Sequence, residues 1–147
     1  MVNSMPSAKV TAYRNGKPFK VTVVAALDRF YLDQTAATKL EEMRDDATIE
    51  KVRIRLRAGF RTRKQLIEEF GFSKKKVEKN ELPADVIALQ NARSVWFSFK
   101  TPEEKRWIEA NAGKFGFCRT LISNDQHYEY RPNKEGCLDL KKKKFLS

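Results

Sequence analysis

Residues 101–121 read TPEEKRWIEANAGKFGFCRTL, and this stretch decides the kind of fold that the chain can adopt. Thr101 suits the N-cap of a helix because its hydroxyl can accept a backbone N–H, and the Pro-Glu-Glu after it suits the first turn. Trp107 and the apolar residues after it recur at helical spacing, and Gly113 or Gly116 is a typical stop. The stretch therefore predicts a helix that leads into a strand.

The chain after this helix predicts two short antiparallel strands and a tail. The strands are CRTLI at 118–122 and HYEYR at 127–131. His127, the only histidine of the chain, begins the second strand. The tail, 138–147, contains a run of four lysines, which is typical of a solvated or partner-contacting segment.

The chain before this helix predicts two strands and another helix. RSVWFSF at 93–99 is an apolar strand pattern. KVRIRLR at 51–57 alternates strictly, which predicts a strand with one buried face and one strongly basic face. Between them, AGFRTRKQLIEEFGF at 58–72 predicts a turn and a helix, with Phe70 on its inward face and Gly71 as the stop.

The N-terminal part predicts a hairpin and a helix. Asn15-Gly16 is the strongest short hairpin signal, because both residues tolerate positive φ, and it predicts a hairpin over 8–26. Asp33 is a suitable N-cap for a helix over 34–46. Strands and helices therefore alternate irregularly from one end of the chain to the other.

Length and composition fit one domain spanning 1–147. The 41% of hydrophobic residues are enough for a packed core despite 33% charged residues. The elements predict an α+β fold, with a small mixed or antiparallel sheet and packed helices. No apolar run reaches the roughly 18 residues of a membrane span, and the N-terminus lacks the apolar core of an export signal.

Cysteine count and charge restrict the partners. Without an export signal, Cys118 and Cys137 are expected as reduced thiols rather than a disulfide, and they are too few for a zinc site of their own. The net charge of +11 favours an acidic partner such as nucleic acid, an anionic cell-wall polymer or an acidic protein surface.

Four stretches, in this order, resemble the zinc D-alanyl-D-alanine carboxypeptidase and L-alanyl-D-glutamate endopeptidase family, which cuts peptidoglycan peptides and includes many phage endolysins. The resemblance covers about residues 30–132. The stretches are FYLDQTAATKLEEM, RLRAGFRTRKQL, EEKRWIEANAGKFGFCRTL and DQHYEYRP. The second resembles a strand followed by S-G-[FY]-R-[ST]-x-x-x-Q, the third W-L-x-x-N-A-x-x-F-G-F, and the fourth E-P-W-H-W-E-Y. The residues that match are Gly59, Phe60, Arg61, Thr62, Gln65, Trp107, Asn111, Ala112, Phe115, Gly116, Phe117, His127, Glu129 and Tyr130.

The resemblance also implies that the zinc site is degenerate. The family holds zinc with the histidine and aspartate of S-x-H-x-x-G-x-A-x-D and the histidine of its last motif. On IALQNARSVW, the first two positions fall on Leu89 and Trp96, and neither side chain can ligate zinc. Asn124 stands where the catalytic glutamate is expected, and an amide cannot act as the general base. Of these positions, only His127 keeps the family residue.

Several alternatives stay open from the residues alone. His127 could instead join Asp85, Asp125 and Glu129 in a different metal site. Arg61 resembles the family arginine that helps to hold the substrate, and it could equally fix its turn by bonding backbone carbonyls. The candidate binding cleft consists of Arg61, Gln65, His127 and Glu129.

We therefore expect a pseudoenzyme without a cofactor, which serves as a binding or structural component of a phage virion or tail. It would be made in the host cytoplasm and then join the virion. Its expected partners are other proteins of an assembly, with peptidoglycan or another anionic polymer also open. The alternatives are a basic protein that binds nucleic acid or an anionic partner, and an active cell-wall hydrolase with an unusual metal site. The candidate basic contact surface consists of Lys51, Arg53, Arg55, Arg57, Arg63 and Lys64.

Overall fold

The computed structural model describes residues 7–27 and 29–139 and contains two antiparallel sheets. The first sheet has the order β1-β2-β3, and its strands are β1 (Ser7–Arg14), β2 (Lys17–Ala26) and β3 (Phe30–Asp33). The second has the order β4-β5-β7-β6, and its strands are β4 (Leu56–Ala58), β5 (Ser94–Phe97), β6 (Phe117–Cys118) and β7 (His127–Tyr130). The fold is α+β, as the sequence predicts.

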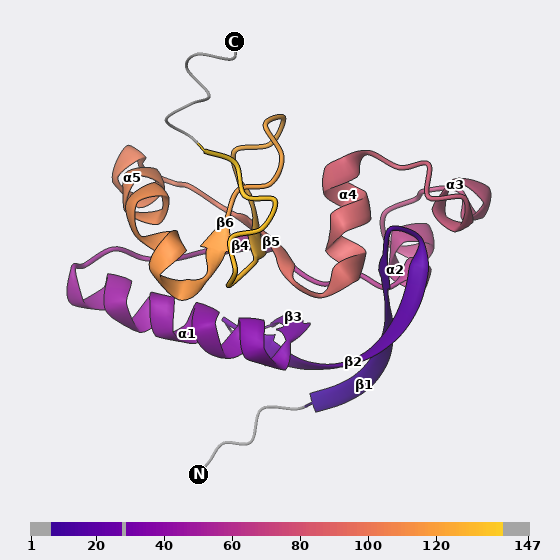
Figure 1. Ribbon diagram of the computed structural model, residues 1–147, viewed down its shortest axis with the longest axis horizontal. Helices are drawn as coiled ribbons and strands as arrows, with labels where there is room; N and C mark the ends of the chain where they lie inside the picture. Colours follow the sequence, from indigo (N-terminus) through magenta and orange to yellow (C-terminus); the bar gives the residue numbers. More distant parts are fainter. Residues whose placement is uncertain (1–6, 28, 140–147) are drawn as a thin grey trace.

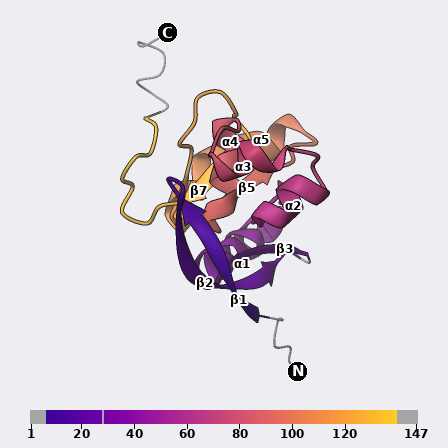
Figure 2. The same cartoon turned by 90° about the vertical axis from the view of Figure 1, so that its right-hand side faces the viewer.

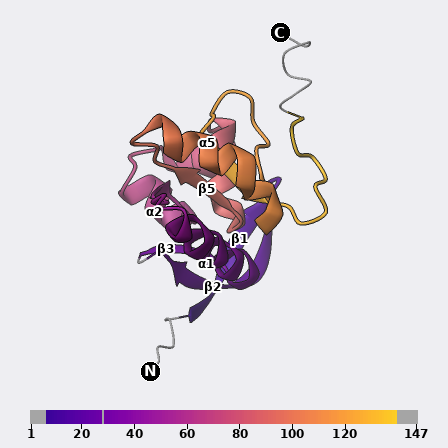
Figure 3. The same ribbon diagram turned by 90° about the vertical axis from the view of Figure 1, so that its left-hand side faces the viewer.

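Helices flank the second sheet on two sides (Figure 1). The helices are α1 (Gln34–Ile49), α2 (Arg63–Glu68), α3 (Lys74–Glu78), α4 (Ala84–Ala88) and α5 (Pro102–Asn111), with short 3-10 helices η1 (Leu89–Asn91) and η2 (Ala112–Phe115). α1 and α5 lie on one side, where Figure 3 shows α5 above α1, and α2, α3 and α4 lie on the other. No helix within 7–27 or 29–139 is long and apolar enough to cross a membrane.

The main core lies between the second sheet and helices α1 and α5. α1 contributes Leu40 and Met43, and β5 contributes Val95 and Phe97, all at most 1% exposed. Alternation along β5 leaves Trp96 on the opposite face, against a smaller apolar cluster built around Leu66 of α2. The second sheet is therefore covered on both faces.

The N-terminal hairpin is confirmed. Arg14 pairs with Lys17, and the turn residues Asn15 and Gly16 have φ of 52° and 77°, the positive values that this turn requires. Figure 2 shows the hairpin crossing the molecule, and Asn15 at its tip lines the same cavity as Glu129 of β7.

The two helix caps predicted from sequence are also confirmed. The Oδ1 atom of Asp33 accepts from the backbone N–H of Thr35 at 2.8 Å and begins α1, which runs three residues further than expected. The Oγ1 atom of Thr101 accepts from the backbone N–H of Glu104 at 3.1 Å and begins α5. The Oδ2 atom of Asp33 also accepts a hydrogen bond from Nε of Arg93 at 3.1 Å, and this bond links the first sheet to the residue before β5.

Three expectations are wrong, and a fourth holds only in part, because the strand expected over 118–122 reaches no further than Cys118 in β6. The segment 51–57 forms a strand only from Leu56, because its pairing with β5 involves Leu56 and Ala58 and the residues before them have no ladder partner. Phe70 is 41% exposed, since α2 ends at Glu68 and the helical periodicity that would turn the ring inward stops there.

The third correction concerns the cysteines, which form a disulfide between Cys118 and Cys137. The chain after β7 turns back along β6, and two backbone hydrogen bonds hold it there. The N–H of Arg131 donates to the carbonyl of Gly116 at 2.7 Å, and the N–H of Leu138 donates to the carbonyl of Arg119 at 2.8 Å. This return places Cys137 beside Cys118, a contact that 19 residues of separation do not disclose in the sequence. The lysine run of the predicted tail lies outside the described residues.

Candidate functional site

The strand pair β5–β7 carries several of the positions that the motif resemblance selects, among them Trp96 and His127. In the antiparallel register Trp96 lies opposite His127, and Ser94 lies opposite Glu129. Directly opposed residues project from the same face of a sheet, so these four side chains share one face. It is the face turned away from the core that Val95 and its neighbours form with α1.

His127 is 0% exposed, and neither Nδ1 nor Nε2 hydrogen-bonds to any residue that the structure describes. Burial lowers the pKa of His127 below its ordinary value, and the carboxylates of Glu129 and Asp85 oppose that shift. The imidazole is therefore neutral at pH 7, which is the form of histidine that ligates a metal. His127 is therefore in the protonation state that a metal ligand requires.

The other zinc-ligand positions that the motif resemblance selects do not have the chemistry of a metal ligand. Trp96 packs against the apolar cluster around Leu66, and the guanidinium of Arg57 lies 5.2 Å from the centre of its ring. Leu89 is fully buried, and its carbonyl accepts from the backbone N–H of Arg61 at 3.1 Å. Ala92, which falls on the glycine of the family motif, has a φ of 67°, a left-handed conformation that favours glycine. The backbone thus has the shape that the motif implies, while the side chains are apolar.

Asn124 organises the loop before β7. Its Nδ2 atom donates to Asp85 at 3.0 Å, and its Oδ1 atom accepts from the backbone N–H of Gln126 at 2.9 Å. Its carbonyl accepts from the backbone N–H of His127 at 3.2 Å. The residue that the motif resemblance assigns to the catalytic glutamate position therefore fixes the entry into β7.

The carboxylates near His127 are engaged elsewhere. Asp125 accepts from the ammonium of Lys105 at 2.8 Å, and this hydrogen bond lowers the pKa of Asp125. The carboxylate of Glu129 accepts from Arg131 at 2.9 Å and from Ser94 at 3.4 Å. Within the described part of the chain, no group of three histidine, cysteine, aspartate or glutamate side chains is placed to hold a metal ion. The residues present do not fit a zinc ion.

Arg61 and Gln65 shape the turn before α2. The Arg61 guanidinium donates to the carbonyl of Phe60 at 3.0 Å, and burial lowers its pKa, with Glu69 opposing. Gln65 forms a capping box with Thr62, in which each side chain bonds the backbone of the other. Both residues thus have structural partners within their own turn.

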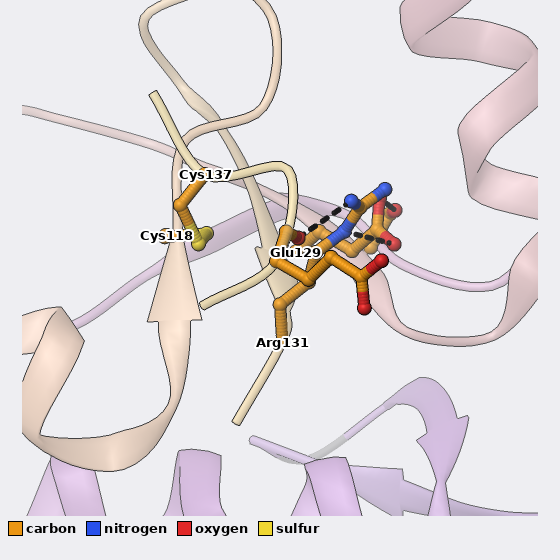
Figure 4. The surroundings of a disulfide bond; sticks show 6 residues. Cys118, Glu129, Arg131 and Cys137 are labelled. Carbon is orange, nitrogen blue, oxygen red and sulfur yellow. Dashed lines mark hydrogen bonds and ion pairs between the residues drawn. A yellow bond between two sulfur atoms is a disulfide. The ribbon is translucent and has the colours of Figure 1, made fainter. Parts of the chain in front are cut away.

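A cavity of about 330 Å³ lies beside Glu129. The hairpin tip at Asn15, the first residue of α4, Ala84, and the returning chain at Gly136 contribute to its wall. Figure 4 shows Glu129 and Arg131 joined by their ion pair close to the disulfide. Sequence reasoning did not single out Arg131, although its position two residues after Glu129 on one strand, with opposite charge, was a usable signal.

The candidate basic surface divides into separate parts. Arg57 lies over the ring of Trp96, and the guanidinium of Arg63 lies 3.7 Å from the ring centre of Tyr13. Lys64 is exposed at the start of α2. The remaining three residues, Lys51, Arg53 and Arg55, line a larger groove on another part of the surface.

No family model matches the chain, and no curated protein matches it. Solved structures do match. A vancomycin resistance D,D-pentapeptidase VanY mutant from a VanB-type resistance cassette, in complex with Zn(II), aligns with a TM-score of 0.56 and 18% identity over 75% of this chain and 78% of that chain. VanYB in complex with D-alanine-D-alanine aligns with the same TM-score and 19% identity over 76% of this chain and 78% of that chain. The chain therefore has the fold of the VanY D,D-peptidases.

Proposed function

We propose that this chain is a catalytically inactive peptidoglycan-peptidase-like domain that acts as a binding or structural component, in a phage virion or tail. The observation that carries the proposal is the position of Trp96 opposite His127. An indole cannot donate a lone pair to zinc, and it occupies the place from which a second ligand would meet the histidine.

The donor set supports the same proposal. A catalytic zinc site needs three protein ligands and an open position for water, together with a group that takes a proton from that water. The chain has one histidine, and the amide of Asn124 is committed to Asp85 and Gln126. No step of a zinc-dependent hydrolysis can therefore be assigned to these residues.

The same face still offers a place to bind. The cavity beside Glu129 is lined by the polar residues Glu129, Arg131 and Asn91, and by Asn15 at the hairpin tip. A fold that no longer needs an open water position can keep such a cavity for a peptide or for another protein. Other proteins of an assembly, and peptidoglycan, are the partners that we propose for it.

Metal analysis and a peptidase assay test the loss of catalysis. The protein is purified without chelator, its zinc content is measured, and release of D-alanine from a peptide ending in D-alanyl-D-alanine is followed with and without added Zn²⁺. We expect no stoichiometric zinc and no turnover. Stoichiometric zinc that disappears in His127→Ala, together with turnover, would overturn the proposal.

Binding is tested separately. Co-sedimentation with purified peptidoglycan is compared between the native protein and Arg131→Gln, with Lys79→Gln as a control that removes the same charge at the C-cap of α3. Co-purification with an assembled particle tests the structural role. Retention on neither peptidoglycan nor a particle would remove the binding part of the proposal and leave the loss of catalysis standing.

A further inference from the structure

A groove of about 910 Å³ is lined by residues near the end of α1, by the segment that joins α1 to β4, and by residues that follow β2 and β5. Figure 1 shows the chain turning back at the end of α1. The apolar floor of the groove includes Val52 and Ile54. Six cationic side chains line it, and no acidic residue is among the described residues that do so. The six are Arg29, Arg44, Lys51, Arg53, Arg55 and Lys100.

Four of these six cations have no carboxylate partner among the residues that the structure describes. Arg44 pairs with Glu41 and Asp45 on its own helix, and Arg55 lies 3.7 Å from Glu104. Arg29, Lys51, Arg53 and Lys100 form no ion pair with any described residue; residue 28 in the adjoining loop lies outside these. Like charges gathered in a concave surface with an apolar floor focus a positive potential there, which attracts an anion.

An aromatic–cation group adjoins the groove at Phe30 and reaches Phe70, which does not itself line the groove, through Arg61. Phe30 lines the groove, and the Arg29 guanidinium lies 5.5 Å from the centre of that ring. The Arg61 guanidinium lies 5.9 Å from the Phe30 centre and 5.2 Å from the Phe70 centre, so one cation bridges the two rings. Phe70 is exposed, and no apolar cluster covers it. These residues come from three separate segments, which hides the arrangement in the sequence.

We propose that this groove binds single-stranded nucleic acid, with its phosphates on Arg29, Lys51, Arg53 and Lys100 and an unpaired base on the ring of Phe70. Guanidinium groups match phosphate geometry, and a basic groove beside an exposed ring is the arrangement by which proteins hold unpaired strands. In a duplex the base faces are already stacked, so an exposed ring favours the single strand. The groove shares no residue with the cavity beside Glu129, so this proposal stands or falls independently of the proposed function.

Fluorescence anisotropy with a labelled mixed-sequence 12-nucleotide DNA, in the full-length protein, tests the proposal. Each phosphate contact on a single strand contributes about −0.7 to the slope of log K against log salt concentration, so four contacts predict about −3. The unlabelled single strand should compete better than its duplex and better than inorganic polyphosphate, which carries charge without bases.

Variants assign the binding to the groove. Lys51→Gln/Arg53→Gln should weaken binding at least about tenfold at low salt and reduce the slope by about 1.4, the share of two contacts. Lys75→Gln/Lys79→Gln removes the same charge from α3 and from its C-cap, where neither side chain forms an ion pair with a described residue, and should leave the affinity within about twofold. Phe70→Ala should weaken oligonucleotide binding roughly tenfold and leave polyphosphate binding unchanged.

Two results would overturn the proposal. If both double variants weaken binding equally, the attraction belongs to the net charge of +11 and not to the groove. The second result is that duplex or polyphosphate competes as well as the single strand and that Phe70→Ala has no effect. In that case the protein does not contact the bases, and single-stranded nucleic acid is the wrong ligand. All variants are first compared with the native protein by thermal unfolding.

Discussion

His127 on β7 and Trp96 on β5 are directly opposed across an antiparallel strand pair, and both project from the face turned away from the main core. Opposed residues in such a pair have Cβ atoms about 5 Å apart. Two side chains at that separation can share one metal ion when both are ligands. The pairing therefore gives a geometric reason for the correspondence between Trp96 and the aspartate of the peptidase motif.

Restoring the motif residues should restore metal binding. In Leu89→His/Trp96→Asp/Asn124→Glu, three potential ligands, including His127, and a carboxylate would come together on a backbone that already has the left-handed turn at Ala92. We expect the triple variant to bind one Zn²⁺ and to gain about 3 kcal/mol of stability at a zinc concentration a hundred times its Kd. Calorimetric titration and thermal unfolding with and without zinc measure this.

The matched control adds His127→Ala to the triple variant, and it should lose the zinc-dependent stabilisation. A folded triple variant that ignores zinc would show that Leu89 and Trp96 do not occupy the ligand positions. The triple variant alone, without zinc, should be less stable than the native protein, because it buries polar groups in place of Leu89 and Trp96.

Stability should fall as the pH is lowered from 7 to 5.5. Burial lowers the pKa of His127 in the folded state, so the unfolded chain, with an ordinary pKa near 6.5, takes up a proton first. The unfolded state then binds more protons than the folded state, and the free energy of unfolding decreases by at most about 1.4 kcal/mol per pH unit. His127 is the only histidine, which makes the assignment direct.

Urea unfolding of the native protein and of His127→Leu at pH 7 and pH 5.5 measures this effect. The difference in the free energy of unfolding should shift in favour of the leucine variant at the lower pH. A difference that is the same at both pH values would mean that the imidazole is protonated equally in the folded and unfolded states.

Local signals in the sequence predicted much of the fold. The Asn15-Gly16 hairpin and the caps at Asp33 and Thr101 depend on a few adjacent residues, and the structure contains all of them. The prediction of a strand over 51–57 was wrong for most of its length. Alternation of apolar and basic residues indicates which side chains share a face, but it does not supply a partner strand. The prediction that Phe70 points inward was wrong because it assumed that the helix continues for one more turn.

The sequence likewise predicted part of the candidate site and missed the rest. The likeness of DQHYEYRP and IALQNARSVW to family motifs selected His127 and Trp96, and the strand register brings those two together. The sequence did not disclose that Phe30, Arg61 and Phe70 form one aromatic–cation group, because their proximity depends on how three segments pack. The Cys118–Cys137 pairing was missed for the same reason.

Removing the disulfide should destabilise the fold by about 3 kcal/mol, the value that loop closure predicts for a bridge of this span. The bridge holds the returning chain that carries Gly136 into the wall of the cavity beside Glu129. Cys118→Ala/Cys137→Ala and the native protein in reductant should unfold at the same, lower urea concentration. A native protein whose unfolding midpoint is unaffected by reductant would show that the bridge contributes nothing in solution.

A side chain at Gly116 should destabilise the fold more than one at Gly71, which supplies the matched comparison. Both have positive φ, 87° and 77°, so alanine at either position costs about 1 kcal/mol in backbone strain. A Cβ atom at Gly116 would also lie 2.6 Å from Cε1 of Tyr130, whose ring is buried against Phe117, whereas nothing lies within 4 Å of a Cβ atom at Gly71. Gly116→Ala should therefore lose roughly 2–4 kcal/mol and Gly71→Ala about 1 kcal/mol in urea unfolding. Equal losses in the two variants would mean that Tyr130 can move aside, and that the turn between η2 and β6 is held by its backbone alone.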